Sequence, residues 1–303
     1  ERKVILEEIA RSEDNPGHVL WDAVYDTMFT TAYRHRVLGS SDTIRSMTRD
    51  AIKNFHRRYY RPNNITVIVV GDIREADVLD KVRELMAGFE PGTIPPLPSL
   101  TEPGPPRTFF SKVRKPVSQT TTILAWPAPA ITSMASAALD VAAAVLGQGR
   151  SSRLYQKIRE KKRLALGVGA SNQAQRGTGV WAISLLTEHQ SADLAREAAL
   201  AEVAALITPS SLPDDEVDKA KVLVESSYVL EHETVEGQGT TLGYFNTVAE
   251  WTLGASYLDR IHAVTAADVT RVITTYLQPE QAVTIRLVPE DEVAQRVIRP
   301  SHK

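Results

Sequence analysis

Apolar residues recur along the chain at two different spacings, and each spacing predicts a different kind of element. From Glu1 to about Phe29 the spacing is helical, with a break at the turn-forming sequence EDNPGH (13–18). The stretch SDTIRSMTRDAIKNFHRRYY (41–60) predicts further helices, because its apolar residues form one stripe. That stripe consists of Ile44, Met47, Ile52, Phe55 and Tyr59. Another amphipathic helix is expected over EADVLDKVRELMAGF (75–89).

A different pattern, continuous and β-branched, occupies ITVIVVGD (65–72), directly after the turn RPNN. Such a run predicts a buried strand. In the later part of the chain, strands are expected at 117–129 and 179–188. Helices are expected at 133–146 and 153–162, separated by GQGRSS. These glycines predict a turn at a helix end, because the segment lacks the spacing of a phosphate-binding loop.

The composition changes in PGTIPPLPSLTEPGPP (91–106), where proline or glycine occupies every second or third position. This predicts an extended, semi-rigid linker. The expected organisation is therefore a first domain at 1–90, a linker at 91–112 and a second domain at 113–303.

Overall composition narrows the class of protein. The 303 residues include 35 basic and 37 acidic side chains, a balance that favours neither nucleic acid nor an anionic membrane as partner. No apolar run approaches the roughly 18 residues of a membrane span. Cysteine is absent, which excludes disulfides, thiolate nucleophiles and cysteine-ligated zinc. The compartment stays open.

An internal repeat links the two parts. TRDAIKNFHRRYYRPNNITVIVVG, from Thr48, aligns without gaps with TAADVTRVITTYLQPEQAVTIRLV, from Thr265. The offset of 217 pairs Tyr59 with Tyr276 and Pro62 with Pro279. Two helix–turn–strand units in one register predict a duplicated domain, with chance similarity as the alternative. If the copies are equal in length, about a hundred residues are expected before Glu1.

Two carboxylates lie on one face of the first expected helix. Glu1 and Glu8 are seven residues apart, and therefore two turns apart on the same face as Val4 and Ile5, whereas Glu7 points elsewhere. A carboxylate on a buried face needs a cation or metal, because burying an unpaired charge is costly. The alternative is a face that is more solvated than its apolar residues suggest.

Three stretches occur in a distinctive order: ERKVILEEI (1–9), then residues 32–72, then GRSSRLYQKIREKKRLAL (149–166). Together with the repeat, they resemble the M16 metallopeptidases, the group of insulin-degrading enzyme, pitrilysin and the mitochondrial processing peptidase. The similarity is closest to short bacterial two-domain subunits. The resemblance implies an α+β fold of duplicated M16-type domains, mixed or antiparallel sheets with packed helices, here with the first domain incomplete. In the family these domains close like a clamshell around a peptide.

The resemblance also implies a Zn2+ cofactor. In the family, two histidines of an H-x-x-E-H motif and a glutamate on a later helix bind the metal, and the glutamate of the motif is the general base. Glu8 matches the ligand glutamate and Glu1 the supporting acid seven residues before it. No two of the seven histidines are four apart, so this chain lacks the motif, and each histidine is interpreted as structural or solvated. The motif is expected about 75 residues before Glu8.

Active family members add an arginine and, seven residues later, a tyrosine that contact the substrate and stabilise the tetrahedral intermediate. Arg159 matches the arginine, but Leu166 stands at the tyrosine position and has no hydroxyl. Tyr155 is interpreted as a core aromatic. The leading hypothesis is a zinc endopeptidase subunit acting on unfolded peptides, paired as a homo- or heterodimer with another M16 subunit. The alternative is a non-catalytic homologue that serves as a structural partner. The sequence leaves the compartment unknown and does not decide between bacterial periplasm and cytoplasm.

Overall fold

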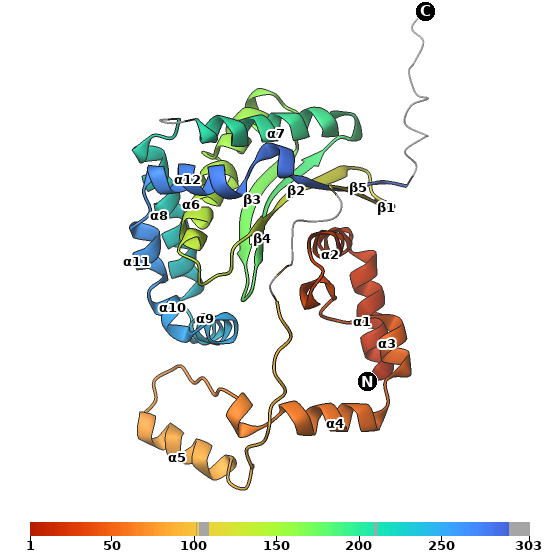
Figure 1. Cartoon of the computed structure of the whole chain (residues 1–303), viewed down its shortest axis with the longest axis vertical. Helices are drawn as coiled ribbons and strands as arrows, with labels where there is room; N and C mark the ends of the chain where they lie inside the picture. Colours follow the sequence, from red (N-terminus) through yellow and green to blue (C-terminus); the bar gives the residue numbers. More distant parts are fainter. Residues whose placement is uncertain (101, 103–108, 209–210, 291–303) are drawn as a thin grey trace, which may run out of the picture.

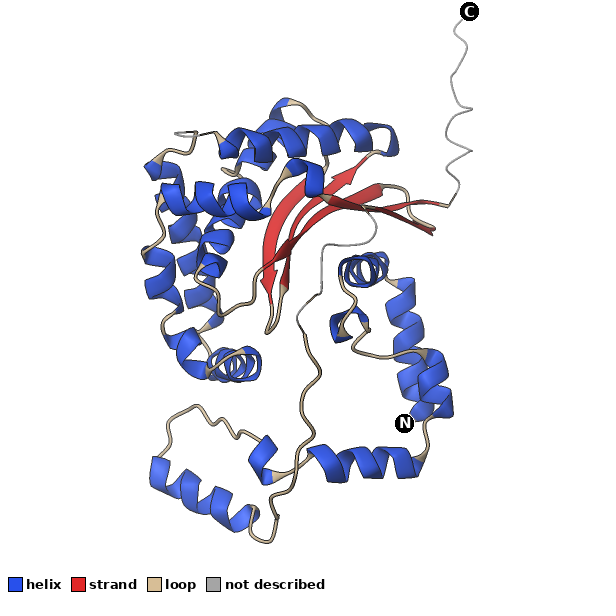
Figure 2. Cartoon of the chain, viewed as in Figure 1, coloured by secondary structure: helices blue, strands red, loops and turns tan. Residues whose placement is uncertain are grey.

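The centre of the molecule is a five-stranded mixed sheet formed entirely by the second part of the chain (Figure 2). The computed structural model describes residues 1–100, 102, 109–208 and 211–290. The strand order is β1-β5-β2-β4-β3, with β1 parallel to β5 and the other neighbours antiparallel. The strands are β1 (Phe110–Lys115), β2 (Thr120–Ala128), β3 (Gly167–Ala174), β4 (Gly179–Thr187) and β5 (Val283–Pro289).

Both faces of this sheet are buried, and strand β2 shows why. Leu124 and Trp126 point to one face and join a core with the helices α6 (Ala135–Gly147), α7 (Ala192–Ile207) and α12 (Ala266–Tyr276). Ile123 and Ala125 point to the other face, because successive side chains of a strand alternate. There they meet the helix α2 (Pro16–Met28). A helix from the first part of the chain therefore completes the core of the second part (Figure 1).

The remaining helices lie outside these two layers. The first part adds α1 (Arg2–Asp14), α3 (Ser41–Ser46), α4 (Arg49–Tyr59) and α5 (Glu75–Leu85). The second part adds α8 (Asp214–Glu231), α9 (Val235–Val248), α10 (Trp251–Ala255) and α11 (Tyr257–His262). The break expected at 13–18 is confirmed, since Asn15 ends α1 and its side chain caps α2. No helix in the described residues is both long enough and apolar enough to cross a bilayer.

The internal repeat is visible in the structure. Helices α4 and α12 begin 217 residues apart and also end 217 residues apart. Their caps correspond as well, because the hydroxyls of Thr48 and Thr265 each accept the backbone N–H of the residue three positions later. The short 3-10 turns Pro62–Asn64 and Pro279–Gln281 keep the same offset. The two copies therefore share local structure up to the strand that follows.

At that strand the copies differ, and the expectation of a buried strand at 65–72 is wrong for the described chain. Ile65, Val67 and Val69 are 38–51% exposed, and the segment has no strand partner among the described residues. Its counterpart β5 pairs with β1 on one side and β2 on the other. A β-branched run becomes a strand only where neighbouring strands accept its backbone hydrogen bonds. Ile68 and Val70 instead lie beside glycines of α9.

The expected stripe on α4 is formed but is not buried. Ile52 is 54% exposed and Phe55 is 58% exposed, whereas their counterparts Val269 and Val272 are at most 2% exposed. In Figure 1, α4 and α5 lie apart from the sheet. The same pattern therefore has two different outcomes, because only α12 has α6, α7 and β2 to pack against.

This contrast predicts unequal effects of matched substitutions. Val269→Ala is expected to lower the free energy of unfolding by about 2 kcal/mol, because it removes two buried methyl groups and leaves a cavity. Ile52→Ala, at the equivalent position, is expected to change it by no more than about 0.5 kcal/mol. Urea unfolding of both variants measures the difference. Equal losses would mean that the α4 stripe is covered in solution.

The expected linker is extended but held at three points. Gly92 and the side chain of Asn63 exchange two hydrogen bonds, of 2.9 and 3.0 Å. Leu100 lies against Gly177 in the β3–β4 turn. The Glu102 carboxylate accepts the backbone N–H and hydroxyl of both Thr30 and Thr31, and these bonds lower its pKa despite partial burial. Residues 101 and 103–108 lie outside the described part, and β1 overlaps the last three residues of the expected linker.

Candidate functional site

The two carboxylates singled out by their spacing lie on the solvent side of α1. Helix α1 buries Ile9 and contacts α2 and α3. Glu1 and Glu8 are exposed, and Val4 between them is 50% exposed. The apolar residues had suggested a buried face here, but the structure shows the solvated alternative. The face is open to a partner, and both side chains are free to approach one.

Within the described part of the chain, the histidines form no metal-binding group with these carboxylates. His18 contacts the Ser12 hydroxyl at 3.3 Å, and His262 contacts the Glu225 carboxylate at 3.1 Å on the second copy. Glu225 is the residue that the repeat offset places opposite Glu8. Among the described residues, no group of three or more histidine or acidic side chains is arranged to hold a metal ion. Glu8 and Glu1 alone supply part of a zinc site, because such a site uses three protein ligands.

The second candidate region is the π-helical turn η3 (Tyr155–Lys161). Arg159 donates a hydrogen bond from Nη1 to the Tyr155 hydroxyl, and its guanidinium carbon lies 4.6 Å from the centre of that ring. Tyr155 is only partly buried, so its interpretation as a core aromatic is wrong. The ring and hydroxyl of Tyr155 instead contact the guanidinium of Arg159. Leu166 is 44% exposed at the start of β3, where its N–H donates to the Leu186 carbonyl.

The turn before this region is structural, as its glycines had indicated. A Cβ at Gly147 would lie 2.2 Å from the backbone nitrogen of Ala170, so only glycine allows α6 to approach β3 this closely. Gly149 has φ +75°, in the left-handed region. Arg153 then pairs with both oxygens of Glu216, each at 2.7 Å. This ion pair fixes η3 against α8.

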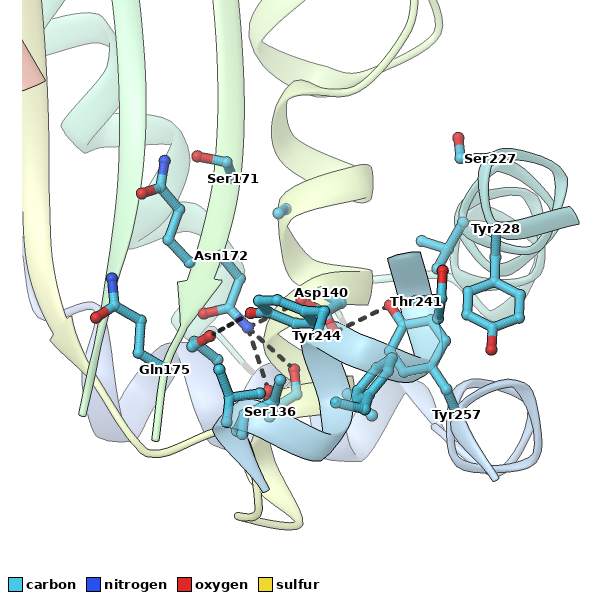
Figure 3. A pocket seen from close by; sticks show the side chains of 18 of the residues that line it. Ser136, Asp140, Ser171, Asn172, Gln175, Ser227, Tyr228, Thr241, Tyr244 and Tyr257 are labelled. Atoms are coloured by element: carbon cyan, nitrogen blue, oxygen red, sulfur yellow. Dashed lines mark hydrogen bonds between the residues drawn. The ribbon is translucent and has the colours of Figure 1, made fainter. Parts of the chain in front are cut away.

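A cavity of about 970 Å³ opens between β3 and α8 (Figure 3). Helix α6 forms its floor with Ser136 and Asp140, and α9 contributes Thr241 and Tyr244. Strand β3 is one of the two outer strands of the sheet, and residues of this strand line the cavity. The wall also contains Tyr25, from the first part of the chain. The cavity therefore adjoins a sheet edge that has no strand partner among the described residues.

Asp140 is the acid at the floor of this cavity. Its carboxylate accepts hydrogen bonds from the Asn172 amide at 2.9 Å and the Tyr257 hydroxyl at 3.1 Å. Burial raises the pKa of Asp140 from 3.8 to about 6, although these bonds and the positive charge of Arg260 act in the opposite direction. Burial and the neighbouring Asp140 also raise the pKa of Tyr257. Asp140 is thus ionised at neutral pH but held in an environment that disfavours its charge.

This pKa predicts an unusual pH dependence of stability. Because the folded pKa lies above the unfolded one, the folded chain binds more protons between about pH 4 and 6. Ionised Asp140 therefore destabilises the fold above about pH 6, and acidification relieves this by up to about 3 kcal/mol. We compare the free energies of unfolding of the wild-type chain and Asp140→Asn. The wild-type value, relative to that of the variant, is expected to rise by about that amount when the pH is lowered from about 7.5 to 4. Urea unfolding of both proteins at both pH values measures this change. If wild type and variant differed by the same free energy at both pH values, the raised pKa of Asp140 would be contradicted.

The hydroxyls of the cavity tyrosines are fixed by hydrogen bonds to the protein. The Tyr244 hydroxyl donates to the Ala174 carbonyl at 3.2 Å, and the Tyr228 hydroxyl donates to the Gly254 carbonyl at 2.8 Å. The Tyr25 hydroxyl is held between Gln173 and Gln175. The walls are therefore rigid aromatic surfaces. The sequence contained one sign of this site, a single acid in the otherwise apolar helix ASAALDVAAAVLG.

Comparison with known proteins shows which family the chain resembles. Residues 46–223 match the family model described as "Peptidase M16 inactive domain". The chain is 36% identical over 178 residues to an uncharacterized zinc protease of Streptomyces coelicolor, covering 55% of this chain and 38% of the relative. It is 27% identical over 304 residues to the zinc protease PqqE of Helicobacter pylori, covering 95% of this chain and 66% of the relative. A zinc protease of Rickettsia felis is covered over 58% of its length, so the chain spans less than two thirds of these relatives.

Solved structures show the same fold. A protease from Helicobacter pylori superimposes with a TM-score of 0.85 at 24% identity, over 95% of this chain and 71% of that one. A peptidase M16 inactive domain from Pseudomonas fluorescens gives a TM-score of 0.79 at 22% identity, over 95% and 69%. At these identities the likeness establishes the α+β fold and no more.

Proposed function

Because the chain belongs to the M16 peptidase family, we propose that it forms part of a zinc-dependent endopeptidase that hydrolyses unfolded peptides. One observation carries the proposal: Glu1, the N-cap residue of α1, and Glu8, seven residues later within the helix, are both exposed. Relatives named zinc proteases support it. Residues 1–90 are assigned to the zinc-side domain and 113–303 to the second domain.

Zinc fits these residues as part of a site. Glu8 would bind the metal, and Glu1 would orient that ligand or take up a proton. When bound, the metal polarises the scissile carbonyl and lowers the pKa of water. The two Cα atoms are about 10 Å apart at 1.5 Å rise per residue, so only one of the carboxylates belongs to the first set of ligands. The histidine ligands must come from polypeptide outside this chain.

The substrate is proposed to lie in extended form along β3. This strand is one of the two outer strands of the sheet, its residues line the cavity, and its outer edge has no strand partner in the described structure. An extended peptide satisfies such an edge by adding a strand, which is sequence-tolerant because the bonds are made by the backbone. Arg159, held in place by Tyr155, is the proposed donor to the substrate. Its guanidinium is well suited to developing negative charge.

A second function is favoured by a specific observation. Leu166 has no hydroxyl, and the matching family model is that of an inactive domain. Both features suit a non-catalytic subunit that builds the chamber of a dimer with another M16 chain. The intact Glu1–Glu8 pair favours the catalytic role, because Glu8 matches the ligand glutamate of the family and Glu1 the supporting acid.

The full-length protein distinguishes these functions. We expect its sequence to contain H-x-x-E-H about 75 residues before Glu8, and the purified protein to retain zinc after dialysis. The 303-residue chain alone is expected to retain none, because zinc sites use three protein ligands. A full-length sequence without the motif would favour the structural subunit. One equivalent of zinc held by the 303-residue chain would contradict the proposed ligand set.

A further inference from the structure

We propose that the cavity between β3 and α8 is a binding subsite for a cationic side chain, arginine or lysine, of a polypeptide lying along β3. This inference deepens the proposed function, because it names the side-chain class that the peptide presents. It also assigns a role to Asp140, which the zinc chemistry does not use. Three features of the cavity carry it: an unpaired carboxylate, aromatic walls and direct continuity with the sheet edge.

The first feature is the carboxylate of Asp140, which has no paired cation in the described structure. Both groups that donate to Asp140, the Asn172 amide and the Tyr257 hydroxyl, are neutral. Arg260 also lines the cavity, and its charge lowers the pKa of Asp140. It donates to the Ser133 carbonyl, however, and makes no hydrogen bond to Asp140. A carboxylate has four lone-pair sites, so Asp140 retains acceptor capacity towards the cavity. Buried charge without a paired cation is costly, and a guest cation removes that cost.

The neighbourhood of Asp140 reinforces this preference. The Oδ1 atom of Asn172 is buried and has no hydrogen-bond donor among the described residues. It lies on the same side chain whose amide group contacts Asp140, so acceptor atoms of Asn172 and Asp140 lie close together (Figure 3). The cavity residues also include one buried donor without a partner in the described structure, Nε of Arg260. Glu231 adds a second carboxylate on the α8 side, while Arg176 lies near the β3–β4 turn. A guanidinium or ammonium, which only donates, complements these acceptors.

The aromatic walls suit the rest of the side chain. Tyr228 and Tyr257 stack with ring centres 5.1 Å apart, and Tyr244 lines the same cavity (Figure 3). Tyrosine faces attract cations and also pack against the aliphatic stem of arginine or lysine. Because the hydroxyls of all three rings are bound to protein acceptors, the rings need not be ordered when the guest enters. Preorganised walls lower the cost of binding.

Position explains why the guest is a polypeptide side chain and not a free amine. The cavity volume of about 970 Å³ exceeds that of one side chain, and its lining includes Ser171 and Asn172 on β3 itself. A peptide that adds to the edge of β3 therefore projects alternate side chains over the opening. One of them reaches the floor formed by α6.

The test compares two blocked pentapeptides, acetyl-Ala-Ala-Arg-Ala-Ala-amide and its twin with citrulline, the neutral isostere, in place of arginine. Binding to the 303-residue chain is measured by calorimetry and by tyrosine fluorescence. We expect the arginine peptide to bind about 10- to 100-fold more tightly, the range of a charge-assisted hydrogen bond. Equal affinities, or no binding of either peptide, would overturn the proposal. No catalysis is involved, so failure of the peptidase function leaves this result unaffected.

Two variants test whether Asp140 is the residue that discriminates between the arginine and citrulline peptides. Asp140→Asn is expected to abolish the preference for arginine over citrulline. Asp215→Asn makes the same change of charge at an exposed position on α8 away from the cavity, and is expected to keep the preference. If Asp140→Asn unfolds, chemical-shift changes of the cavity tyrosines in the wild-type chain replace it. A preference that survives Asp140→Asn, or shifts confined to other tyrosines, would place the cation elsewhere.

Discussion

Glu8→Ala in the full-length protein is expected to abolish zinc retention and to lower kcat/KM by more than 100-fold. A metal ligand contributes more than its supporting residues, whose loss typically costs about 10- to 100-fold. Glu1→Gln is therefore expected to fall within that lower range and to retain the metal. The structure supports the comparison, because Glu1 at the N-cap and Glu8 within α1 are both exposed and neither is needed to pack the helix.

Glu7→Ala is the matched control. Glu7 is adjacent in sequence and also exposed, but it points away from the face shared by Glu1 and Glu8. It is expected to leave both zinc content and kcat/KM within about twofold of wild type, as for a surface substitution. Metal analysis and peptide hydrolysis measure all three variants. If Glu7→Ala were the variant that lost zinc, the ligand assignment would be wrong by one residue.

The full-length protein by itself is expected to be nearly inactive, and a partner M16 subunit is expected to restore hydrolysis. Leu166 cannot donate a hydrogen bond to the tetrahedral intermediate, and loss of one such donor typically costs 100- to 1000-fold in rate, or about 2.7–4 kcal/mol. A partner that presents its own arginine and tyrosine would supply the missing donors. Leu166 is 44% exposed at the start of β3, so a larger side chain fits there without disturbing the core.

Two substitutions of Leu166 separate the effect of a hydroxyl group from the effect of an aromatic ring. Leu166→Tyr is expected to recover part of the missing rate in the lone subunit if Arg159 faces the metal, and Leu166→Phe is expected to recover none. Hydrolysis of an unfolded peptide with and without partner measures both. Full activity of the wild-type protein alone, unchanged by any added subunit, would contradict the dimer proposal. Recovery with phenylalanine would show that packing, not hydrogen bonding, limits the rate.

Local signals in the sequence determined where many helices begin and end. Asn15, Thr48 and Thr265 each stand at a helix start, and each side chain accepts the backbone N–H groups that a helix leaves unpaired. The repeat offset of 217 then aligned the sequence of α4 with that of α12, and the two helices begin and end at equivalent residues. Caps and turns act over a few residues, so they need no knowledge of the rest of the fold.

Strands were determined less well, because a strand depends on its neighbours. The most β-branched run, residues 65–72, is not a strand, whereas the mixed polar sequence of β1 and the glycine-containing sequence of β3 are. β1 is stabilised by β5, more than 160 residues later, and β3 by β4. The backbone hydrogen bonds that define these strands come from residues that no local window contains.

The candidate site shows the same division. The spacing of Glu1 and Glu8 follows from the helix period alone, so the sequence determined that they share a face. Whether that face is buried depended on what packs against α1, and the structure shows it exposed. The environment of Asp140 depended entirely on tertiary structure. Asn172 and Tyr257 lie 32 and 117 residues away in the chain, and only the approach of β3 and α11 to α6 brings them to one carboxylate.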